Sequence, residues 1–272
     1  MEDADSRTTA TPSDDLERIV GFCRYLDDRC SERIFSSFLA TALLCESLPL
    51  VYARNFLRVE DPEAGANELA ALADRIFGAT GMAHRKVIAD SAEIGERLAP
   101  QFESLGWKVT RAIAMVYAGS AEQERLPLVA EVTSEEMLPF WETLVAEVTD
   151  EERGSRPASE ELVGQLTEQH LLVERSIDCQ HFARRLDGRV ASGCSLYSRG
   201  GTAQIEAVGT LSEYRNQGLA SSVVRRAAWE AFASGHDLVW LMANEDDWPK
   251  ALYAKLGFSP IGRFYEFMRT PA

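Results

Sequence analysis

A short segment near residue 215 has the composition of a phosphate-binding loop. The run Arg215-Asn216-Gln217-Gly218-Leu219-Ala220-Ser221 follows an apolar, strand-like stretch and leads directly into a helical pattern. The first N–H groups of a helix lack partners within it, and the helix dipole adds partial positive charge there. Gly218 and Ala220 are small enough for a phosphate to approach the backbone closely. The segment therefore predicts an anion site at a helix N-terminus.

Two common nucleotide-binding motifs do not describe this loop. It lacks the terminal Gly-Lys-Ser/Thr of a P-loop and the Gly-x-Gly-x-x-Gly of a dinucleotide-binding fold. Arg215-x-x-Gly218-x-Ala220 instead resembles the pyrophosphate signature of the GNAT acetyltransferase superfamily. Downstream, the run Leu252-Tyr253-Ala254-Lys255-Leu256-Gly257-Phe258 resembles the family's Leu-Tyr-x-x-Leu/Phe-Gly-Phe segment. The resemblance spans residues 127–272 and implies acetyl-CoA as cofactor.

The resemblance also implies roles for individual residues. The main chain of residues 208–210 would pair with the pantetheine arm, and the amides of residues 216–221 would hold the pyrophosphate. Tyr253 would protonate the departing thiolate, unless it is only a core aromatic residue. In the family, an Asn usually stands where this chain has Asp246, so Asn244 replaces it as a candidate. The implied cofactor-binding residues are Val208, Gly209, Thr210, Arg215, Asn216, Gln217, Gly218, Leu219, Ala220, Ser221, Asn244 and Tyr253.

Acetyl transfer requires an unprotonated amine, and a carboxylate or imidazole near the thioester would supply the base. Glu206 is the first candidate, because regular strand alternation places it on one sheet face with Val208 and Thr210. The alternative is a Glu that faces solvent or pairs with an Arg. His181 is a second candidate, with a half-buried surface histidine as its alternative. No residue pattern indicates a metal site, and none is expected.

The run Glu245-Asp246-Asp247 precedes Trp248 and allows two interpretations. Acidic and aromatic groups together attract cations, so the run is suited to drawing an amine toward the site. It is also typical of a solvated turn that caps the helix beginning near Trp248 and Pro249.

Composition limits the partners. Of 272 residues, 43 are Asp or Glu and 28 are Lys or Arg, which gives a net charge of −15. This charge disfavours nucleic acid as a partner and suits cationic amines as substrates. The alternative is that the excess of acidic residues only keeps the protein soluble. The five cysteines show no CxxC pairing and indicate reduced thiols in a cytoplasmic protein. We expect no signal peptide and no membrane span.

The C-terminal half, residues 127–272, has the pattern of a mixed sheet with helices on both faces. Asp187-Gly188 between two β-rich runs predicts a hairpin, since both residues tolerate positive φ. The expected strands are 128–132, 179–186, 189–198, 204–211, 238–243 and 261–268, and the expected helices are 134–148, 159–174, 218–233 and 247–256.

The N-terminal half shows a β-α-β-α-β order after a first helix. Leu105-Gly106-Trp107 echoes Leu256-Gly257-Phe258, and both runs follow a helix and open a strand. We therefore expect two GNAT-like domains, each a mixed, mostly antiparallel twisted sheet flanked by helices. The N-terminal domain lacks the glycine signature, so a structural or substrate-shaping role is favoured over a retained, inactive cofactor site. The expected divisions are a tail 1–13, domain 14–118, linker 119–126 and domain 127–272, with helices 14–29, 64–77 and 91–105 and strands 84–89 and 107–117.

The sequence thus predicts an N-acetyltransferase that acts by direct attack in a ternary complex. The alternative is a module that binds or senses acyl-CoA without transferring the acetyl group. An oxidoreductase is disfavoured because both the dinucleotide motif and a suitably spaced ribose carboxylate are missing. The acceptor is expected to be a small-molecule or peptide amine, and the protein a monomer or homodimer.

Overall fold

The computed structural model describes residues 11–119, 128–153 and 159–270, of which 150–153 are described by their backbone alone. Strands and helices are interspersed along both halves of this part of the chain. They are α1 (Pro12–Arg29), β1 (Arg33–Ser36), β2 (Ala40–Leu44), η1 (Tyr52–Arg54), β3 (Phe56–Val59), α2 (Ala66–Ala79), β4 (Arg85–Ala89), α3 (Ala92–Ser104), β5 (Lys108–Tyr117), β6 (Val129–Val132), α4 (Ser134–Arg153), α5 (Glu160–Ser176), β7 (Asp178–Leu186), β8 (Arg189–Arg199), β9 (Thr202–Thr210), η2 (Ser212–Tyr214), α6 (Leu219–Ala233), β10 (Leu238–Asn244), α7 (Pro249–Lys255) and β11 (Phe258–Arg269).

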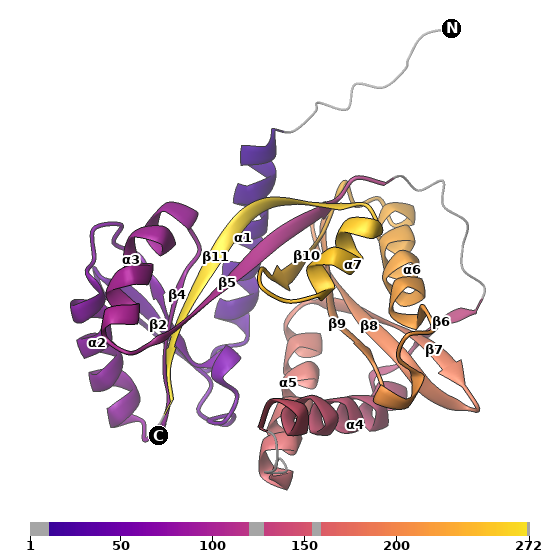
Figure 1. The fold of residues 1–272 in the computed structure, drawn as a ribbon, viewed down its shortest axis with the longest axis horizontal. Coiled ribbons are helices and arrows are strands. Elements are labelled where there is room, and N and C mark those ends of the chain that lie inside the picture. Colours follow the sequence, from indigo (N-terminus) through magenta and orange to yellow (C-terminus); the bar gives the residue numbers. More distant parts are fainter. Residues whose placement is uncertain (1–10, 120–127, 154–158, 271–272) are drawn as a thin grey trace, which may run out of the picture.

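The strands of the described residues form one 11-stranded sheet that runs through both halves of the molecule (Figure 1). Its order is β1-β2-β3-β4-β11-β5-β10-β9-β8-β7-β6. Neighbouring strands are antiparallel except for the parallel pairs β3–β4 and β9–β10. The expected fold class, a mixed α/β structure with a twisted sheet flanked by helices, is confirmed.

The two halves exchange their last strands. β5 lies between β10 and β11, and β11 lies between β4 and β5. The β5–β11 ladder runs from Phe258 opposite Tyr117 to Met268 opposite Lys108. Figure 1 shows this long pair crossing from one half to the other. Instead of one separate sheet for each half, the exchange therefore produces a single continuous sheet.

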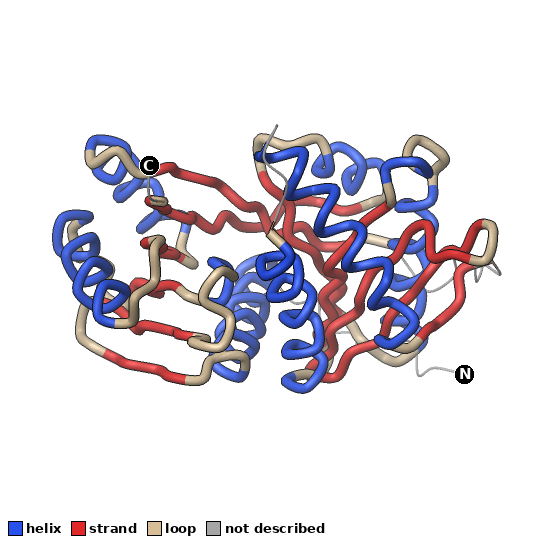
Figure 2. Tube along the Cα trace, turned by 90° about the horizontal axis from the view of Figure 1, so that it is seen from below, coloured by secondary structure: helices blue, strands red, loops and turns tan. Residues whose placement is uncertain are grey.

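Side-chain alternation on β5 divides the helices into two layers. Ile113 and Met115 pack in a core with residues of α6 and α7, whereas Ala112 and Ala114 pack against residues of α1 and α5. Val109, which shares the face of Ile113, packs in the core that α2 and α3 cover. Helices consequently lie on both sides of the strands (Figure 2).

Most of the expected elements are present, with shifts of a few residues at their ends. Asp187 and Gly188 have φ values of 50° and 81°, so the predicted hairpin turn is confirmed. α1 begins at Pro12, because the Thr11 hydroxyl accepts the Asp14 N–H in a capping box. Residues 30–47, for which no type was predicted, contain β1 and β2. The expected tail and linker lie outside the described residues, except for residues 11–13 and Gly119.

Candidate active site

The site is built where two parallel strands separate. β9 and β10 pair from Thr202 opposite Leu238 only as far as Gln204 opposite Trp240. Beyond this point β10 remains paired with β5, whereas β9 remains paired with β8. The β10-facing main chain of residues 206–210 therefore has no strand partner among the described residues. Such an edge can accept an extended ligand through backbone hydrogen bonds.

A bulge changes the direction of the side chains on β9. Ala207 has a φ of 53°, and the β8–β9 register shifts between Gly193 and Ser195. An extra residue in a strand reverses the faces of all residues that follow it. Glu206 lies opposite Ser195, on the face covered by α4 and α5, whereas Val208 packs against the core under α6. The prediction that Glu206 shares a face with Val208 and Thr210 was therefore wrong.

The glycine loop has the geometry of an anion site. Gly218 adopts a left-handed conformation with φ 74°, which favours glycine, and it precedes α6 as the N-cap residue. Within the described residues, no side chain caps α6, and its first helical bond joins the Ser222 N–H to the Gly218 carbonyl. The amides of residues 219–221 precede that bond. They are the groups that an anion at a helix N-terminus would use.

Side chains of α4 hold the loop in place. The Glu147 carboxylate accepts the backbone N–H and the hydroxyl of Ser212, both at 2.9 Å. It also lies 3.9 Å from an Nη of Arg215, whose Nε donates to the Thr210 carbonyl at 3.4 Å. The cationic side chain of Arg215 is therefore anchored beside the free edge of β9.

A groove of about 800 Å³ joins the loop to the splayed strands. Of the predicted cofactor-binding residues, all line it except Gln217 and Asn244. The Asn244 Oδ1 instead accepts the Asp246 N–H at 3.1 Å, at the end of the β10–β5 ladder. Seven further lining residues were not predicted as cofactor contacts, and they are Leu144, Val148, Tyr214, Asp247, Trp248, Pro249 and Leu252.

Tyr253 of α7 lines the groove together with the glycine loop and is 8% exposed. Burial raises the pKa of its phenol, and the charge of Glu206 raises it further. The phenol therefore keeps its proton at neutral pH and is available as a proton donor.

Glu206 is a carboxylate with a raised pKa. Burial raises the pKa, and the opposing effects of Arg54 and of the Gln204 amide are smaller. The Gln204 Nε2 donates to Glu206 at 2.8 Å. A raised pKa makes a carboxylate a better proton acceptor for an amine. The structure thus places both candidate catalytic groups near the separation of β9 and β10, on opposite faces of the sheet.

The N-terminal half contributes Arg54, which sequence reasoning missed. It follows a loop that Asn55 organises, because the Asn55 Nδ2 donates to the carbonyls of Leu48 and Val51, at 2.9 and 3.1 Å, and its Oδ1 accepts the Cys45 N–H at 2.8 Å. Arg54 pairs with Asp27 of α1 at 3.7 Å, and its charge acts on Glu206.

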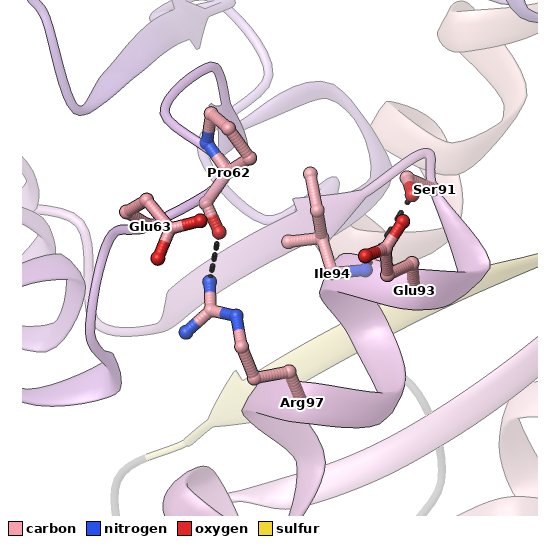
Figure 3. A pocket seen from close by; sticks show the side chains of 6 residues that line it. All are labelled: Pro62, Glu63, Ser91, Glu93, Ile94 and Arg97. Carbon is pink, nitrogen blue, oxygen red and sulfur yellow. Dashed lines mark hydrogen bonds between the residues drawn. The ribbon is translucent and has the colours of Figure 1, made fainter.

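The N-terminal half has a smaller hollow at the corresponding helix start, of about 270 Å³ (Figure 3). Arg97 spans it and donates to the carbonyls of Pro62 and Ala64. Two N–H groups at the start of α2 are already bonded, that of Gly65 to Glu68 at 3.1 Å and that of Ala66 to the Gln101 side chain at 3.2 Å. The hollow is lined by Pro62, Glu63, Ser91, Glu93, Ile94 and Arg97.

The remaining candidate groups are placed as follows. Glu245 pairs with Arg263 at 2.7 Å, whereas Asp247 and Trp248 line the groove. His181 is 3% exposed and therefore is not the half-buried surface residue of the alternative interpretation.

Each of the five cysteines is a free thiol. Across the described part of the chain, no cluster of three or more His, Cys, Asp or Glu side chains is suited to a metal, and no helix is long and apolar enough to cross a membrane.

Comparison with known proteins agrees with this architecture. The structure is similar to that of a functionally unknown conserved protein from Staphylococcus epidermidis, with a TM-score of 0.65 and 17% identity over 89% of this chain and 95% of that one. It is similar to a GCN5-related N-acetyltransferase from Kribbella flavida, with a TM-score of 0.62 and 20% identity over 94% and 95% of the two chains. A tandem GNAT protein from the clavulanic acid biosynthesis pathway has a TM-score of 0.54 and 15% identity, over 86% of this chain and 79% of that one.

At these identities the likeness concerns the fold alone. No curated protein matches the chain. The family model of the acetyltransferase (GNAT) family matches residues 141–258, a range that contains the glycine loop, Glu206 and Tyr253. Residues 141–258 are therefore similar to the GNAT acetyltransferase family.

Proposed function

We propose that the protein transfers the acetyl group of acetyl-CoA to a primary amine, by direct attack within a ternary complex. The observation that carries this proposal is one groove lined both by the uncapped start of α6 and by the buried Tyr253. The start of α6 suits a pyrophosphate, and the Tyr253 phenol is a proton donor for a thiolate. Acetyl-CoA, when bound, supplies the activated acetyl thioester.

The residues of the groove fit the parts of the cofactor. Gly218 has open space where a Cβ would stand, and the amides of residues 219–221 lie at the positive end of the α6 dipole. The free edge of β9 offers backbone groups to the amides of the pantetheine arm. Gly209 admits no side chain, because an added Cβ would meet Leu144 at 2.2 Å, so α4 packs directly on this strand.

Glu206 and Tyr253 take part in two different proton transfers, one from the amine and one to the departing sulfur. The bulge at Ala207 turns Glu206 toward the face covered by α4 and α5, away from the α6 face on which Val208 packs. Glu206 removes the amine's proton, and the Tyr253 phenol donates a proton to the sulfur as it leaves.

Further properties of the protein follow the same proposal. The acceptor is a small-molecule or peptide amine, which suits a chain with a net charge of −15. The protein acts in the cytoplasm as a monomer or homodimer. Residues 14–118 form a degenerate GNAT-like domain, and residues 127–272 form the catalytic domain.

Thermal unfolding with and without acetyl-CoA tests the cofactor site. Ligand at 100 times its Kd adds ~2.7 kcal/mol to the stability of the native state and raises the Tm by several degrees. Gly218→Glu should abolish this shift. Gly106→Glu is the matched control, because Gly106 has the same φ of +74° and open space at its Cβ but lies in the N-terminal half.

Thiol release from acetyl-CoA then tests transfer, with a panel of polyamines, amino acids, aromatic amines and peptide N-termini as acceptors. Release that depends on one class of amine would identify the acceptor class. A thermal shift without release by any amine would favour a protein that binds or senses acyl-CoA. No shift at saturating acetyl-CoA would refute both functions.

A further inference from the structure

Trp248 is an exposed aromatic residue in the wall of the groove. It is 70% exposed, whereas Trp107, Trp141 and Trp240 are at most 3% exposed. Single exposed apolar residues are common on protein surfaces and need no special explanation. An exposed indole that lines a groove differs from them, because apolar and aromatic side chains form most of the contact surface of small-molecule sites. The position of Trp248 within the groove therefore decides which part of a ligand it contacts.

The turn that carries Trp248 has its own interactions. The Trp248 N–H donates to the Asp247 Oδ1 at 2.7 Å, and Pro249 at the start of α7 has a φ that its ring fixes. Just before them, Glu245 pairs with Arg263 at 2.7 Å. The backbone is therefore held locally while the indole remains exposed to the groove.

The order of strands and helices places Trp248 beside the glycine loop. β9 and β10 are parallel, so their C-terminal ends lie at the same edge of the sheet. The glycine loop follows β9, and the turn 245–248 follows β10. β10 and β11 are both antiparallel to β5, so α7 carries the chain back toward the point where β9 and β10 separate. Tyr253 is five residues further along α7, about 7.5 Å closer to that point. Trp248 thus lies on the glycine-loop side of Tyr253.

The facing wall of the groove is also apolar at this level. Val148 of α4 lines the groove and is 40% exposed. It follows Glu147, whose carboxylate accepts the Ser212 N–H just after β9, so it too lies near the C-terminal end of that strand. α4 packs on the face of β9 opposite to α6 and α7. Trp248 and Val148 therefore approach the groove from opposite faces of the sheet.

The parts of acetyl-CoA match this arrangement in order. With the pyrophosphate at the amides of residues 219–221, the pantetheine arm extends along the free edge of β9 toward Tyr253. The adenosine is attached to the other end of the pyrophosphate and therefore points away from Tyr253, to the side of Trp248 and Val148. Adenine is flat and aromatic, and nucleic-acid bases stack on Trp side chains in this way.

The acceptor amine fits this position less well. An amine has to reach the acetyl carbonyl, which the Tyr253 phenol places toward the other end of α7. The acidic turn before Trp248 would suit a cation, but Arg263 already neutralises Glu245, and the Asp247 carboxylate accepts the Trp248 N–H. The surface left for a ligand is the face of the indole.

We propose that Trp248 stacks on the adenine ring of acetyl-CoA, with Val148 on the facing wall, an assignment that rests on the proposed use of acetyl-CoA. Trp248 then contributes to the affinity for the cofactor and takes no part in the chemistry. A donor that lacks the adenosine, such as S-acetyl-4′-phosphopantetheine, gains nothing from it.

Tryptophan fluorescence tests the contact directly. All five tryptophans lie in the described residues, and Trp248 is the most exposed of those with a stated exposure, so acrylamide should quench mainly its emission. Saturating adenosine 3′,5′-bisphosphate, which has the adenine and no pantetheine arm, should protect this component. Trp248→Phe should lack the component altogether. Unchanged quenching of the wild type at saturating acetyl-CoA would overturn the proposal.

Affinities measured by isothermal titration test which part of the cofactor is bound. Trp248→Ala should raise the Kd for acetyl-CoA ~10-fold or more, and Trp248→Phe should raise it less because an aromatic ring remains. The Kd for S-acetyl-4′-phosphopantetheine should be the same in both variants and the wild type. Phe38→Ala is the matched control, because Phe38 is 81% exposed but lies in the N-terminal half, and it should leave both Kd values unchanged.

The outcomes separate this proposal from the proposed function. Wild-type protein that binds acetyl-CoA while Trp248→Ala binds it equally well would overturn the adenine contact alone. Equal losses for acetyl-CoA and S-acetyl-4′-phosphopantetheine would place the indole on the arm, and a raised KM for the amine alone would place it on the acceptor. Either result overturns the proposal. No binding of acetyl-CoA by the wild type would refute the proposed function and this contact together.

Discussion

The two halves place the same elements around a helix start and use them differently. In the C-terminal half, no side chain caps α6, and a groove of about 800 Å³ lies beside it. In the N-terminal half, Glu68 and Gln101 bind the N–H groups of Gly65 and Ala66 at the start of α2, and the nearby hollow is about 270 Å³. An N–H group that is bonded within the protein is not free to bind a phosphate. The difference shows that a shared topology does not imply a shared site.

A second position repeats this contrast. Tyr253 and Phe102 each stand three residues before a Leu-Gly-aromatic run. Phe102 is 0% exposed and stacks on Phe267 with a centroid distance of 4.3 Å, whereas Tyr253 lines the groove. The N-terminal residue stabilises a core, and the C-terminal residue carries a hydroxyl toward the proposed reaction.

Binding stoichiometry is the strongest test of the contrast. Isothermal titration should show one acetyl-CoA per chain, because the groove beside α6 is about 800 Å³ whereas the hollow in the N-terminal half is about 270 Å³. Gly218→Glu should then abolish binding altogether, and Gly106→Glu should leave the stoichiometry at one. A second binding event that survives Gly218→Glu would mean that the N-terminal hollow also accepts the cofactor.

Tyr253→Phe converts the C-terminal position to the residue type of the N-terminal half. Loss of the proton donor should lower kcat by ~100-fold or more, as for other general acids. Because the ring remains, the KM for acetyl-CoA should change little. Equal thermal unfolding of the two proteins would show that the loss is chemical, and a variant with normal kcat would exclude the phenol as the acid.

The pH dependence of kcat should reveal Glu206. Its pKa is raised, so the carboxylate becomes protonated at a higher pH than an ordinary Glu. As the pH falls below that raised pKa, the base is lost and kcat should fall about tenfold per pH unit. Glu206→Gln should have a low rate without this acidic limb. An unchanged limb in Glu206→Gln would assign it to another group.

The smallest expected effect is on stability, and it comes from the hydrogen bond of Glu68 at the start of α2. Glu68→Ala removes the partner of the Gly65 N–H and should lower the free energy of unfolding by about 1 kcal/mol, measured from urea midpoints. Glu103→Ala, at an exposed position on α3, should leave it nearly unchanged. Equal effects of the two substitutions would show that the capping interaction contributes no stability of its own.

Local features of the fold were predictable because short-range chemistry determines them. The glycine loop, the Asp187-Gly188 turn and most helix ends depend on residues that are neighbours in sequence. The faces of β9 were mispredicted, because Ala207 is not a residue type that marks a left-handed bulge. The role of Arg54 depends on packing between the halves, and the strand exchange depends on pairing between residues far apart in the chain. No local pattern encodes either.

The crossed pair β5 and β11 has a consequence for any attempt to divide the protein. A fragment that begins after residue 119 would lose β5 and leave a strand-wide gap between β10 and β11. A fragment that ends at Tyr117 would keep β5 but lose β11, its neighbour on the β4 side. Each piece would expose unpaired strand edges, which promote aggregation. For protein engineering, the two halves are therefore one unit of expression, and a graft of the C-terminal half must carry a substitute for β5.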